Sequence, residues 1–351
     1  MHGHVCERKN LWLYSRMLLY IILLCISFIL LSSSHQFNRF STAKQIVDYY
    51  ANKKNRNLSS KTIIVTGGNA GIGLETVKSL AYAGAKVILC SRNTTAGIEA
   101  IENEIKRPGW GDYIVDSTNI IVLPLDLSSI NSIKKFAKYI HRTEKSIDAL
   151  ILNAGIMSLP KLDRTTEWTS IEKQMAVNHF GHAALTRLLL PILKKSKTNS
   201  RVIFLSSSAH RFGNKNLMKN LYNGFYIPWI AYGQSKLANL LYAKGLAKHL
   251  YDTGFSKINV VSVHPGVITS TQLFKQSIAT RLFSLLPGDR SMTQGAASTV
   301  WASIADEIDD NDMRGAYITN CKKQNPNANG RDVNLMNEVF TVTEKILDEK
   351  L

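Results

Sequence analysis

Short apolar runs alternate with longer amphipathic stretches over most of this chain. Six such runs, of four to six residues each, lie at 62–65, 87–90, 120–125, 149–152, 202–205 and 258–263. The segments between them have helix length, and the patterns at 74–83, 169–194 and 231–250 predict three of the helices. Strands that alternate with helices form parallel sheets covered on both faces. The pattern therefore predicts a single doubly wound α/β sheet of about seven strands.

A different pattern precedes residue 61. Between Arg16 and Arg39 there is no charged residue, and the centre of this stretch, 17–31, is almost wholly apolar. As a helix, residues 17–38 would extend about 33 Å, enough to cross a hydrocarbon layer of about 30 Å. We predict a short basic segment at 1–16, a transmembrane anchor at 17–38, a polar linker at 39–60 and one folded domain at 61–351. A cleaved signal peptide, with the serines at 32–34 near the cleavage site, is the alternative.

Composition narrows the function classes. The chain has 351 residues, which suits one large α/β domain, and a formal net charge of +17. Lysine and arginine are spread along the chain without an arginine-rich run, so we expect no nucleic-acid binding, and a basic surface against anionic lipid is the other interpretation. The four cysteines lie far apart and form no CxxC pair. They indicate neither a disulfide framework nor a zinc site, and no metal is expected.

The first predicted strand ends in a glycine-rich turn. The turn reads Thr66-Gly67-Gly68-Asn69-Ala70-Gly71-Ile72-Gly73, and a predicted helix follows it. Glycines at a strand-to-helix turn let the backbone approach a pyrophosphate, and the helix N-terminus supplies free N–H groups. The spacing is Gly-x-x-x-Gly-x-Gly rather than Gly-x-Gly-x-x-Gly. The flanking strand and helix favour dinucleotide binding over a purely structural turn.

The end of the second predicted strand indicates which dinucleotide binds. A carboxylate at this point holds the ribose 2′-hydroxyl of NAD, whereas an arginine accommodates the 2′-phosphate of NADP. The chain has Cys90-Ser91-Arg92 here and no carboxylate. We therefore predict NADP(H) as the cofactor, with Arg92 beside the 2′-phosphate.

Tyr232 and Lys236 lie four residues apart in the predicted helix 231–250. Residues at this spacing share one face of a helix, so the phenol and the ammonium can point into the same cleft. A nearby ammonium favours the phenolate and makes the proton easier to transfer near neutral pH, as general acid–base catalysis requires. The pair alone is common by chance, so its meaning depends on the motifs that precede it.

Six motifs occur in an order and at a spacing typical of one family. They are the turn 66–73, Leu152-Asn153-Ala154-Gly155, Asn178, the serines 206–208, Tyr232 with Lys236, and His264-Pro265-Gly266. In these positions residues 61–320 resemble the short-chain dehydrogenase/reductase family. Leu152 departs from the family pattern, which has asparagine there. The resemblance implies a Rossmann-type fold and hydride transfer between a nicotinamide and an alcohol or carbonyl.

The resemblance also implies catalytic roles. Tyr232 would be the general acid towards a carbonyl or the base towards an alcohol. Lys236 would hold the nicotinamide ribose and lower the pKa of Tyr232. Ser207 would hydrogen-bond the substrate oxygen, while Ser206 and Ser208 would only make hydrogen bonds at the strand end. Asn178 would position a water that connects Lys236 to solvent.

The cofactor-binding set combines the turn, Arg92 and the family positions. Its members are Thr66, Gly67, Asn69, Gly71, Ile72, Gly73, Ser91, Arg92, Asp126, Leu127, Asn153, Ala154, Gly155, Tyr232, Lys236, Pro265, Gly266, Val267 and Thr269. Asp126 matches a family aspartate that contacts adenine, and a helix N-cap before Ser128 is an equally good interpretation. Asn153 would steady the sheet near the cofactor, and Thr269 would touch the carboxamide.

Within the family, the chain is similar to the retinol dehydrogenase-like group, which includes the WW-domain-containing oxidoreductases. The likeness rests on residues 178–182, 207–212 and 232–239, and no WW domain precedes residue 61. Two segments with many apolar residues, at 212–229 and 273–286, would surround the substrate, the second as a lid, with ordinary core packing as the alternative. The cations of Lys275, Arg281 and Arg290 would suit a membrane surface.

These features predict an anchored oxidoreductase for a hydrophobic alcohol or carbonyl: a retinoid, or another lipid such as a steroid or fatty aldehyde. We expect a single-pass protein of the endoplasmic reticulum or a related membrane. A glycan at the sequon Asn93-Thr94-Thr95 would crowd the cofactor, which favours a cytosolic catalytic domain. A homodimer is left open. The alternative is a cofactor-binding interaction protein of the same fold with little turnover.

Overall fold

The structure is a computed structural model that describes residues 36–54, 57–105, 115–157, 159–219, 221, 226–269 and 290–351. The chain divides into two compact units, and the second, Arg39–Leu351, contains nearly all of the described residues. The predicted anchor lies outside the described residues except for 36–38, which are not helical. Within the described part of the chain, no helix is both long and apolar enough to cross a membrane.

An eight-stranded sheet runs through the second unit, in the order β10-β9-β8-β7-β4-β1-β2-β3. All neighbouring strands pair in parallel except β10, which pairs antiparallel with β9. The strands are β1 (Thr62–Thr66), β2 (Lys86–Ser91), β3 (Ile120–Pro124), β4 (Ala149–Leu152), β7 (Ser200–Leu205), β8 (Ile258–Val263), β9 (Tyr317–Thr319) and β10 (Lys322–Gln324). The predicted mainly parallel Rossmann-type sheet is confirmed.

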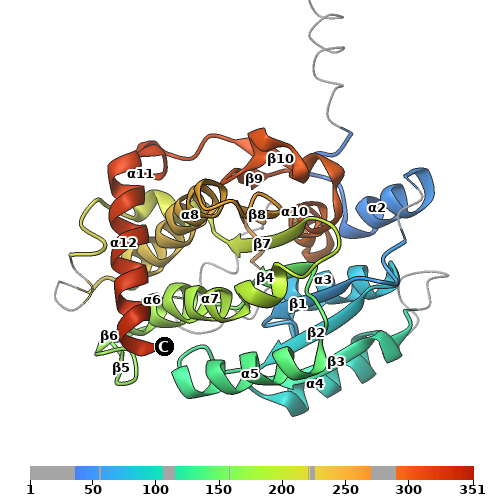
Figure 1. Cartoon of the computed structure of the whole chain (residues 1–351), viewed down its shortest axis with the longest axis horizontal. Helices are drawn as coiled ribbons and strands as arrows, with labels where there is room; N and C mark the ends of the chain where they lie inside the picture. Colours follow the sequence, from blue (N-terminus) through green and yellow to red (C-terminus); the bar gives the residue numbers. More distant parts are fainter. Residues whose placement is uncertain are drawn as a thin grey trace, which may run out of the picture. The chain divides into compact units, whose positions relative to one another are not determined.

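Most helices of the second unit lie in the connections between the strands, while α2 precedes β1 and α11 and α12 follow β10 (Figure 1). They are α2 (Ala43–Asp48), α3 (Gly71–Tyr82), α4 (Thr94–Ala100), α5 (Ile130–Thr143), α6 (Lys173–Met175), α7 (Gly181–Leu193), α8 (Pro228–Asp252), α10 (Met292–Ile304), α11 (Ala328–Arg331) and α12 (Val333–Lys350). A turn of π-helix, η4 (Ala176–Phe180), joins α6 to α7, and a short 3-10 helix, η5 (Ser208–Phe212), follows β7.

Alternate strand residues pack on opposite faces of the sheet, because successive side chains of a strand point in opposite directions. Ile64, Ile88 and Leu150 belong to one large apolar cluster with side chains of α5, α7, α8 and α12. Their neighbour Leu89 points the other way, towards α3 and α4. Both sets are fully buried, which explains why these strands are continuous apolar runs rather than alternating ones.

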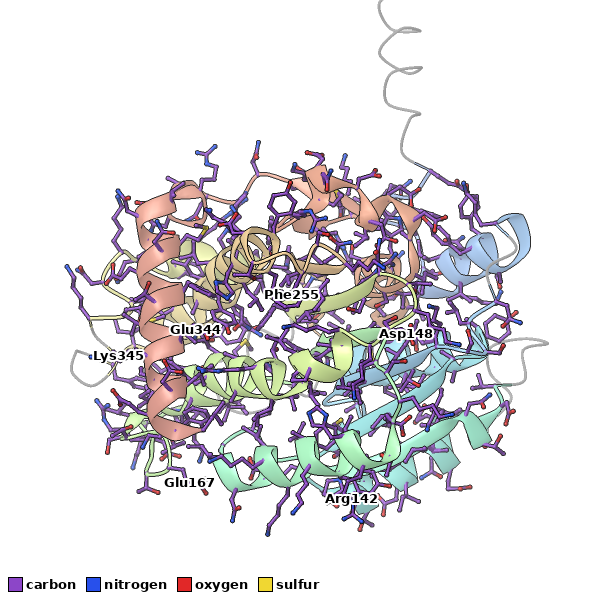
Figure 2. The ribbon with its side chains drawn as sticks, in the orientation of Figure 1. Arg142, Asp148, Glu167, Phe255, Glu344 and Lys345 are labelled. Carbon is purple, nitrogen blue, oxygen red and sulfur yellow. The ribbon has the colours of Figure 1, made fainter. Side chains whose placement is uncertain are left out.

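The C-terminal helix α12 closes one side of the apolar cluster. Figure 2 shows Glu344 and Lys345 on opposite sides of this helix. Glu344 accepts a hydrogen bond from the hydroxyl of Tyr242 in α8, at 2.6 Å, and pairs with Arg187 of α7 at 3.5 Å. These contacts fix α12 to the two helices that carry the catalytic motifs.

Residues 39–60 are not a linker throughout. Residues 43–48 form α2, which is followed by a π-helical turn at Tyr49–Lys53 and packs against α3 and α10. Ile46, Val47 and Tyr50 are buried, and the Tyr50 hydroxyl donates to Glu307 at 2.6 Å. The folded unit therefore begins before Lys61, because this short segment presents an apolar face that its polar composition conceals.

The long helix predicted at 169–194 starts later than expected. Thr169 and Ser170 have left-handed backbone angles, with φ of 54° and 62°, which a helix cannot contain. They form the turn of a small antiparallel hairpin of β5 (Arg164–Thr165) and β6 (Ile171–Glu172). The helical segment begins at Lys173, and Pro191 lies in its last turn as predicted.

Candidate active site

The carboxyl ends of the parallel strands bring most of the predicted site residues to one edge of the sheet. In parallel strands these ends all lie at the same edge, where open α/β sheets bind their ligands. Thr66 ends β1, Ser91 ends β2 and Asn153 directly follows β4. Ser207 and His264 lie within two residues of the ends of β7 and β8. At the opposite edge, Asp148 (Figure 2) precedes β4 and accepts a hydrogen bond from Thr62 N at 2.9 Å.

The glycine-rich turn has the backbone that its sequence predicts. Gly67 and Gly71 have positive φ angles of 64° and 55°, a region that favours glycine. The N–H groups of Gly67 and Gly68 both donate to the carbonyl of Cys90 in β2, at 2.8 and 3.3 Å. A Cβ atom at Gly73 would lie 2.2 Å from the Gly67 oxygen. Only glycine therefore lets the first turn of α3 pack this closely on the end of β1.

Asn153 and Ala154 fasten this turn to the end of β4. The Asn153 side-chain amide donates to the carbonyls of Thr66 and Gly67, at 2.9 and 3.2 Å. The backbone N–H of Ala154 donates to the Thr66 hydroxyl at 3.0 Å. A Cβ atom at Gly155 would lie 3.4 Å from the Asn178 amide oxygen and 3.5 Å from the Lys236 ammonium. This backbone therefore connects the turn to the catalytic residues.

Arg92 lies beside the turn. It is exposed and comes two residues after Cys90, whose carbonyl binds the turn. Ser91 is buried, and its hydroxyl donates to the Asn93 carbonyl at 2.8 Å, while the Asn93 side chain caps α4. The guanidinium is thus the charged group that follows β2, where the sequence analysis expects the 2′-phosphate.

Asp126 forms a turn after β3 but is not the N-cap of the next helix. Its carboxylate accepts from the N–H and hydroxyl of Ser128, at 2.9 and 2.6 Å. The N-cap of α5 is Ser129, and Leu127 packs into the main apolar cluster. The capping interpretation of Asp126 is wrong by three positions, because an Asx turn precedes the helix.

The turn after β8 is closed by an arginine. Gly266 has a φ of 95°, and Arg290 packs directly against it and donates to the Pro265 carbonyl at 3.0 Å. From the sequence, Arg290 was expected to face a membrane surface. It instead folds onto the turn after β8. Thr269 is half-buried and directly precedes 270–289, which lie outside the described residues, as does most of the predicted lid. Three other predicted cofactor residues are half-buried: Asn69, Ile72 and Val267.

The structure brings the predicted catalytic residues together around the start of α8. The Ser207 hydroxyl is a hydrogen-bonding neighbour of the Tyr232 phenol and lowers its pKa. The Lys236 ammonium lies 5.5 Å from the centre of the Tyr232 ring and donates to the Leu205 carbonyl at 3.0 Å. The hydroxyl of Ser206 holds the Lys236 backbone carbonyl at 2.8 Å, which agrees with its predicted structural role. The pair thus sits on the end of β7.

Burial sets the protonation of both groups. It raises the pKa of Tyr232 well above its ordinary value, and the hydrogen bond from Ser207 only partly opposes this. Burial also lowers the pKa of Lys236 to about 8. The predicted lowering of the Tyr232 pKa by the Lys236 ammonium is therefore not seen in the protein alone, where desolvation of the phenolate is the largest cause. Tyr232 is protonated at neutral pH and can donate its proton.

Asn178 occupies the π-helical turn η4 and is fully buried. Its side chain makes a reciprocal pair with the backbone of Ile156, at 2.9 Å for each bond. It also donates to the hydroxyl of Ser235 at 3.0 Å, and that hydroxyl donates to the Tyr232 carbonyl at 2.7 Å. Ser235 therefore links Asn178 to the Tyr232 turn of α8. The sequence analysis missed this role, although Ser235 lies inside the Tyr232–Lys236 motif.

Two buried histidines support the catalytic residues, and neither was predicted. His182 bridges the Asn178 carbonyl and the Thr66 hydroxyl, with both distances 2.9 Å. His179 bridges the side chains of Asn239, at 3.2 Å, and Thr343 of α12, at 2.9 Å. Burial lowers their pKa values to about 3 for His182 and about 4 for His179, so both are neutral at pH 7. Their spacing around Asn178 was the available signal.

An apolar cluster surrounds the Tyr232 phenol. Met157 and Ala209 belong to it, with Trp229 packed against it. Leu217 and Leu221, which the sequence analysis placed around the substrate, pack into the main core instead. Their apolar character serves folding, whereas Trp229 packs beside Tyr232. Within the described residues, no cluster of acidic, histidine or cysteine side chains could hold a metal ion.

This arrangement of side chains suits proton transfer to or from a substrate oxygen. It holds a protonated phenol, a hydroxyl and an ammonium together at the sheet edge where the glycine turn opens. The sequence model of the family described as short chain dehydrogenase matches residues 61–282 of this chain. The chain belongs to the short-chain dehydrogenase family. Its oxidoreductases use nicotinamide dinucleotides, and the bare turn of Gly67, Gly71 and Gly73 fits such a cofactor.

Relatives of known name agree with this family. The chain is 33% identical to retinol dehydrogenase 12 of Mus musculus over 94% of this chain and 98% of that protein. It is 34% identical to the WW domain-containing oxidoreductase of Danio rerio, over 84% of this chain and 70% of that protein. It is 35% identical to short-chain dehydrogenase TIC 32 A, chloroplastic, of Brassica napus, over 82% and 88%. The retinol dehydrogenase-like resemblance is confirmed.

Solved structures show the same fold. An uncharacterized protein from Mycobacterium paratuberculosis matches with a TM-score of 0.62 and 29% identity, over 82% of this chain and 93% of that one. The NADP complex of RhlG from Pseudomonas aeruginosa matches with a TM-score of 0.54 and 22% identity, over 75% and 96%. At that identity the second likeness supports the fold alone.

Proposed function

We propose that this protein transfers a hydride between NADP(H) and a hydrophobic alcohol or carbonyl substrate, a retinoid or another lipid. The observation that carries the proposal is the arrangement of Tyr232, Ser207, Lys236 and Asn178 at the edge where the glycine turn opens. When bound, the cofactor would supply or accept the hydride. The protein's own part is to orient the substrate oxygen and transfer one proton.

The residues present can do both. With a carbonyl substrate, the Tyr232 hydroxyl would donate its proton to the oxygen that becomes the alcohol, while Ser207 hydrogen-bonds the same oxygen. Lys236 would hold the cofactor ribose and, with a pKa of about 8, can also exchange a proton near neutral pH. Asn178 would position a water that connects Lys236 to solvent. Ser207 is near enough to Tyr232 to lower the pKa of its phenol, which supports a substrate oxygen held by both hydroxyls.

The choice of NADP over NAD rests on Arg92. A guanidinium binds a phosphate with two parallel hydrogen bonds, and 91–93 offer no carboxylate that would repel it. Backbone groups of the turns at the sheet edge would also contact the dinucleotide. They belong to Thr66, Asn69, Ile72, Ala154 and Val267. The apolar group at Tyr232, with Trp229 beside it, favours a hydrophobic substrate. The name retinol dehydrogenase 12 on a relative covered almost end to end suggests retinal for the first assay.

Two further parts of the proposal concern placement. We infer that residues 17–38 anchor the protein in a membrane, because this stretch is uncharged and long enough to span it. We also infer that the catalytic unit faces the cytosol, because a glycan at Asn93 would crowd the cofactor. A membrane-bound enzyme would meet a lipid substrate directly. The absence of nucleic-acid binding also remains an expectation, and a homodimer is left open.

The test is a turnover assay of the purified full chain with all-trans-retinal, decanal and a steroid ketone, each with NADPH and with NADH. We expect NADPH-dependent reduction of at least one of these substrates. The variant Arg92→Glu should weaken NADPH binding by about 100-fold and leave NADH within a few-fold, because only NADPH loses a charged pair. The matched control is Arg142→Glu, an exposed arginine of α5 (Figure 2). Equal loss of both cofactors would contradict the assignment to NADP.

A scaffold of the same fold is the second candidate. It would bind NADPH and show no turnover with any carbonyl compound. The intact set of Asn178, Ser207, Tyr232 and Lys236 argues against it, because a protein that only binds partners has no need for a protonated phenol beside a buried ammonium.

A further inference from the structure

A second cavity lies apart from the hydride-transfer site. It has a volume of about 380 Å³ and is walled by the last two turns of α8, the hairpin β9–β10 and the short helix α11. These elements lie side by side in Figure 1. None of the predicted catalytic or cofactor residues lines it. The size is that of a site for a small organic molecule.

Cations dominate the lining of this cavity, which we call the C-terminal pocket. Five basic side chains line it and no acidic side chain does: Lys244, Lys248, Arg314, Lys323 and Arg331. Lys248 pairs with Asp252, and Lys323 pairs with Asp312 at 2.6 Å. The other three have no carboxylate partner within the described part of the chain. The C-terminal pocket therefore has about three positive charges in excess.

Lys244 shows that this excess is felt inside the pocket. Its ammonium is largely buried and donates to the carbonyl of Gly330, a neutral group, at 2.7 Å. Burial lowers the pKa of Lys244, and the charges of Arg331 and Lys323 lower it further. Like charges thus repel one another across the cavity. An anion placed among them would relieve this repulsion.

One wall of the C-terminal pocket is apolar. Ala247, Tyr317 and Met336 are buried there, and the ring of Tyr251 is held in place by Arg314, 4.9 Å from the ring centre. Lys244, Ala247, Lys248 and Tyr251 have the helical spacing i, i+3, i+4, i+7, so α8 presents one continuous face to the cavity. A ligand that fits needs an anionic end and an apolar body.

We propose that the C-terminal pocket binds the phosphate group of an organic phosphate monoester. A phosphate monoester carries about −1.5 to −2 charges at pH 7, which matches three unpaired cations better than a carboxylate does. The two guanidinium groups supply the forked donors that bind phosphate oxygens in pairs, and the apolar wall accepts the organic part. The ester is either a soluble metabolite or the headgroup of an anionic lipid. The proposal is independent of the hydride-transfer proposal.

The first arm of the test uses phenyl phosphate and isothermal titration calorimetry on the full chain. We expect binding that weakens at least fivefold in Arg331→Gln, an exposed site whose loss should not disturb folding, and further in Lys244→Met with Arg331→Gln. The control Lys195→Gln with Lys197→Gln removes two equally exposed charges outside the pocket and should bind normally. Benzoate should bind at least fivefold more weakly than phenyl phosphate.

The second arm replaces phenyl phosphate with vesicles, in a flotation assay with phosphatidic acid in phosphatidylcholine against phosphatidylcholine alone. Binding to the soluble ester that depends on Arg331 supports a metabolite site. If phenyl phosphate does not bind, an excess of binding to phosphatidic acid vesicles over phosphatidylcholine alone, again dependent on Arg331, supports a lipid headgroup site; the anchor would contribute equally to both vesicles. The proposal is overturned if neither probe binds, if benzoate binds equally well, or if the control variant loses as much binding as Arg331→Gln. If phenyl phosphate binds at Arg92 instead, its affinity would not change in Arg331→Gln, and that result would also overturn the proposal.

Discussion

Helix α8 carries two lysines, the buried Lys236 and the half-buried Lys244, with different surroundings. Lys236 and Lys244 lie eight residues, or about 12 Å, apart along the helix. Each ammonium donates to one backbone carbonyl, Leu205 at 3.0 Å for Lys236 and Gly330 at 2.7 Å for Lys244. Burial lowers the pKa of both, but only Lys244 is also affected by neighbouring cations. One helix therefore serves two kinds of site.

The difference lies in the neighbours. Around Lys236 the contacts are neutral hydroxyls, amides and histidines, all hydrogen-bonded, so this ammonium is the charge that titrates among fixed dipoles. Such an environment suits proton transfer. Around Lys244 the neighbours are cations that line the C-terminal pocket, which suits the capture of an anion. A lysine in a sequence pattern therefore carries no function until its neighbours are known.

The largest effect that tests this contrast is on turnover. Lys236→Met should lower the rate of NADPH-dependent carbonyl reduction by about 10²–10⁴, because the charge that holds the ribose and assists the proton is lost. The thermal midpoint should stay level or rise, since a buried ammonium is replaced by an apolar chain of similar length. Steady-state kinetics and a melting curve on one sample measure both. Full turnover in this variant would show that Lys236 is only structural.

A smaller effect is expected from the neutral network itself. His182→Ala removes the bridge between the Asn178 carbonyl and the Thr66 hydroxyl and leaves both buried. We expect a loss of about 3 kcal/mol in the free energy of unfolding, from two lost hydrogen bonds and a cavity. His141→Ala in exposed α5 is the matched control and should cost under about 1 kcal/mol. Urea unfolding at pH 7 compares them; equal costs would contradict the bridging role.

The pH dependence of stability offers a finer test. Burial holds His179, His182 and His264 neutral in the folded state, with pKa values of about 4, 3 and 3, below the ordinary 6.5. As pH falls below 6.5, these histidines become protonated in the unfolded chain but stay neutral in the folded protein. The free energy of unfolding therefore decreases. The slope is about 1.4 kcal/mol per pH unit for each such histidine. Urea unfolding between pH 6.5 and 5 measures it, and constant stability over that range would show charged histidines.

Much of the fold could be predicted because its cause is local. Six strands are continuous apolar runs, and glycine at 67, 71 and 73 is required by the backbone of the turn. The hairpin at 164–172 could not be predicted, since each strand has two residues and Ile171 fits a helical pattern equally well. The α2 segment was missed for a similar reason. Its apolar face is too short to form a pattern, and α3 and α10 provide the packing that stabilises it.

The residues of the site also divide into those that the sequence could predict and those that it could not. Tyr232, Lys236, Ser207 and Asn178 were found because the family motifs fix their positions. The raised pKa of Tyr232 was not, because desolvation depends on the apolar residues that the fold collects around the phenol. His182 was missed because its partner Thr66 lies 116 positions away in the chain. The C-terminal pocket was missed because its five cations come from α8, α11, β10 and the segment before β9, which are separate in the sequence.

The proposed proton donor is tested most directly by Tyr232→Phe, measured as NADPH oxidation with the best carbonyl substrate at saturating cofactor. The change removes one hydroxyl and leaves the apolar packing with Met157 and Ala209 intact, so folding and NADPH binding should be unchanged. We expect the rate to fall by about 10²–10⁴ at every pH from 6 to 8. A variant that binds NADPH normally and retains the wild-type rate would contradict the assignment of Tyr232 as the general acid.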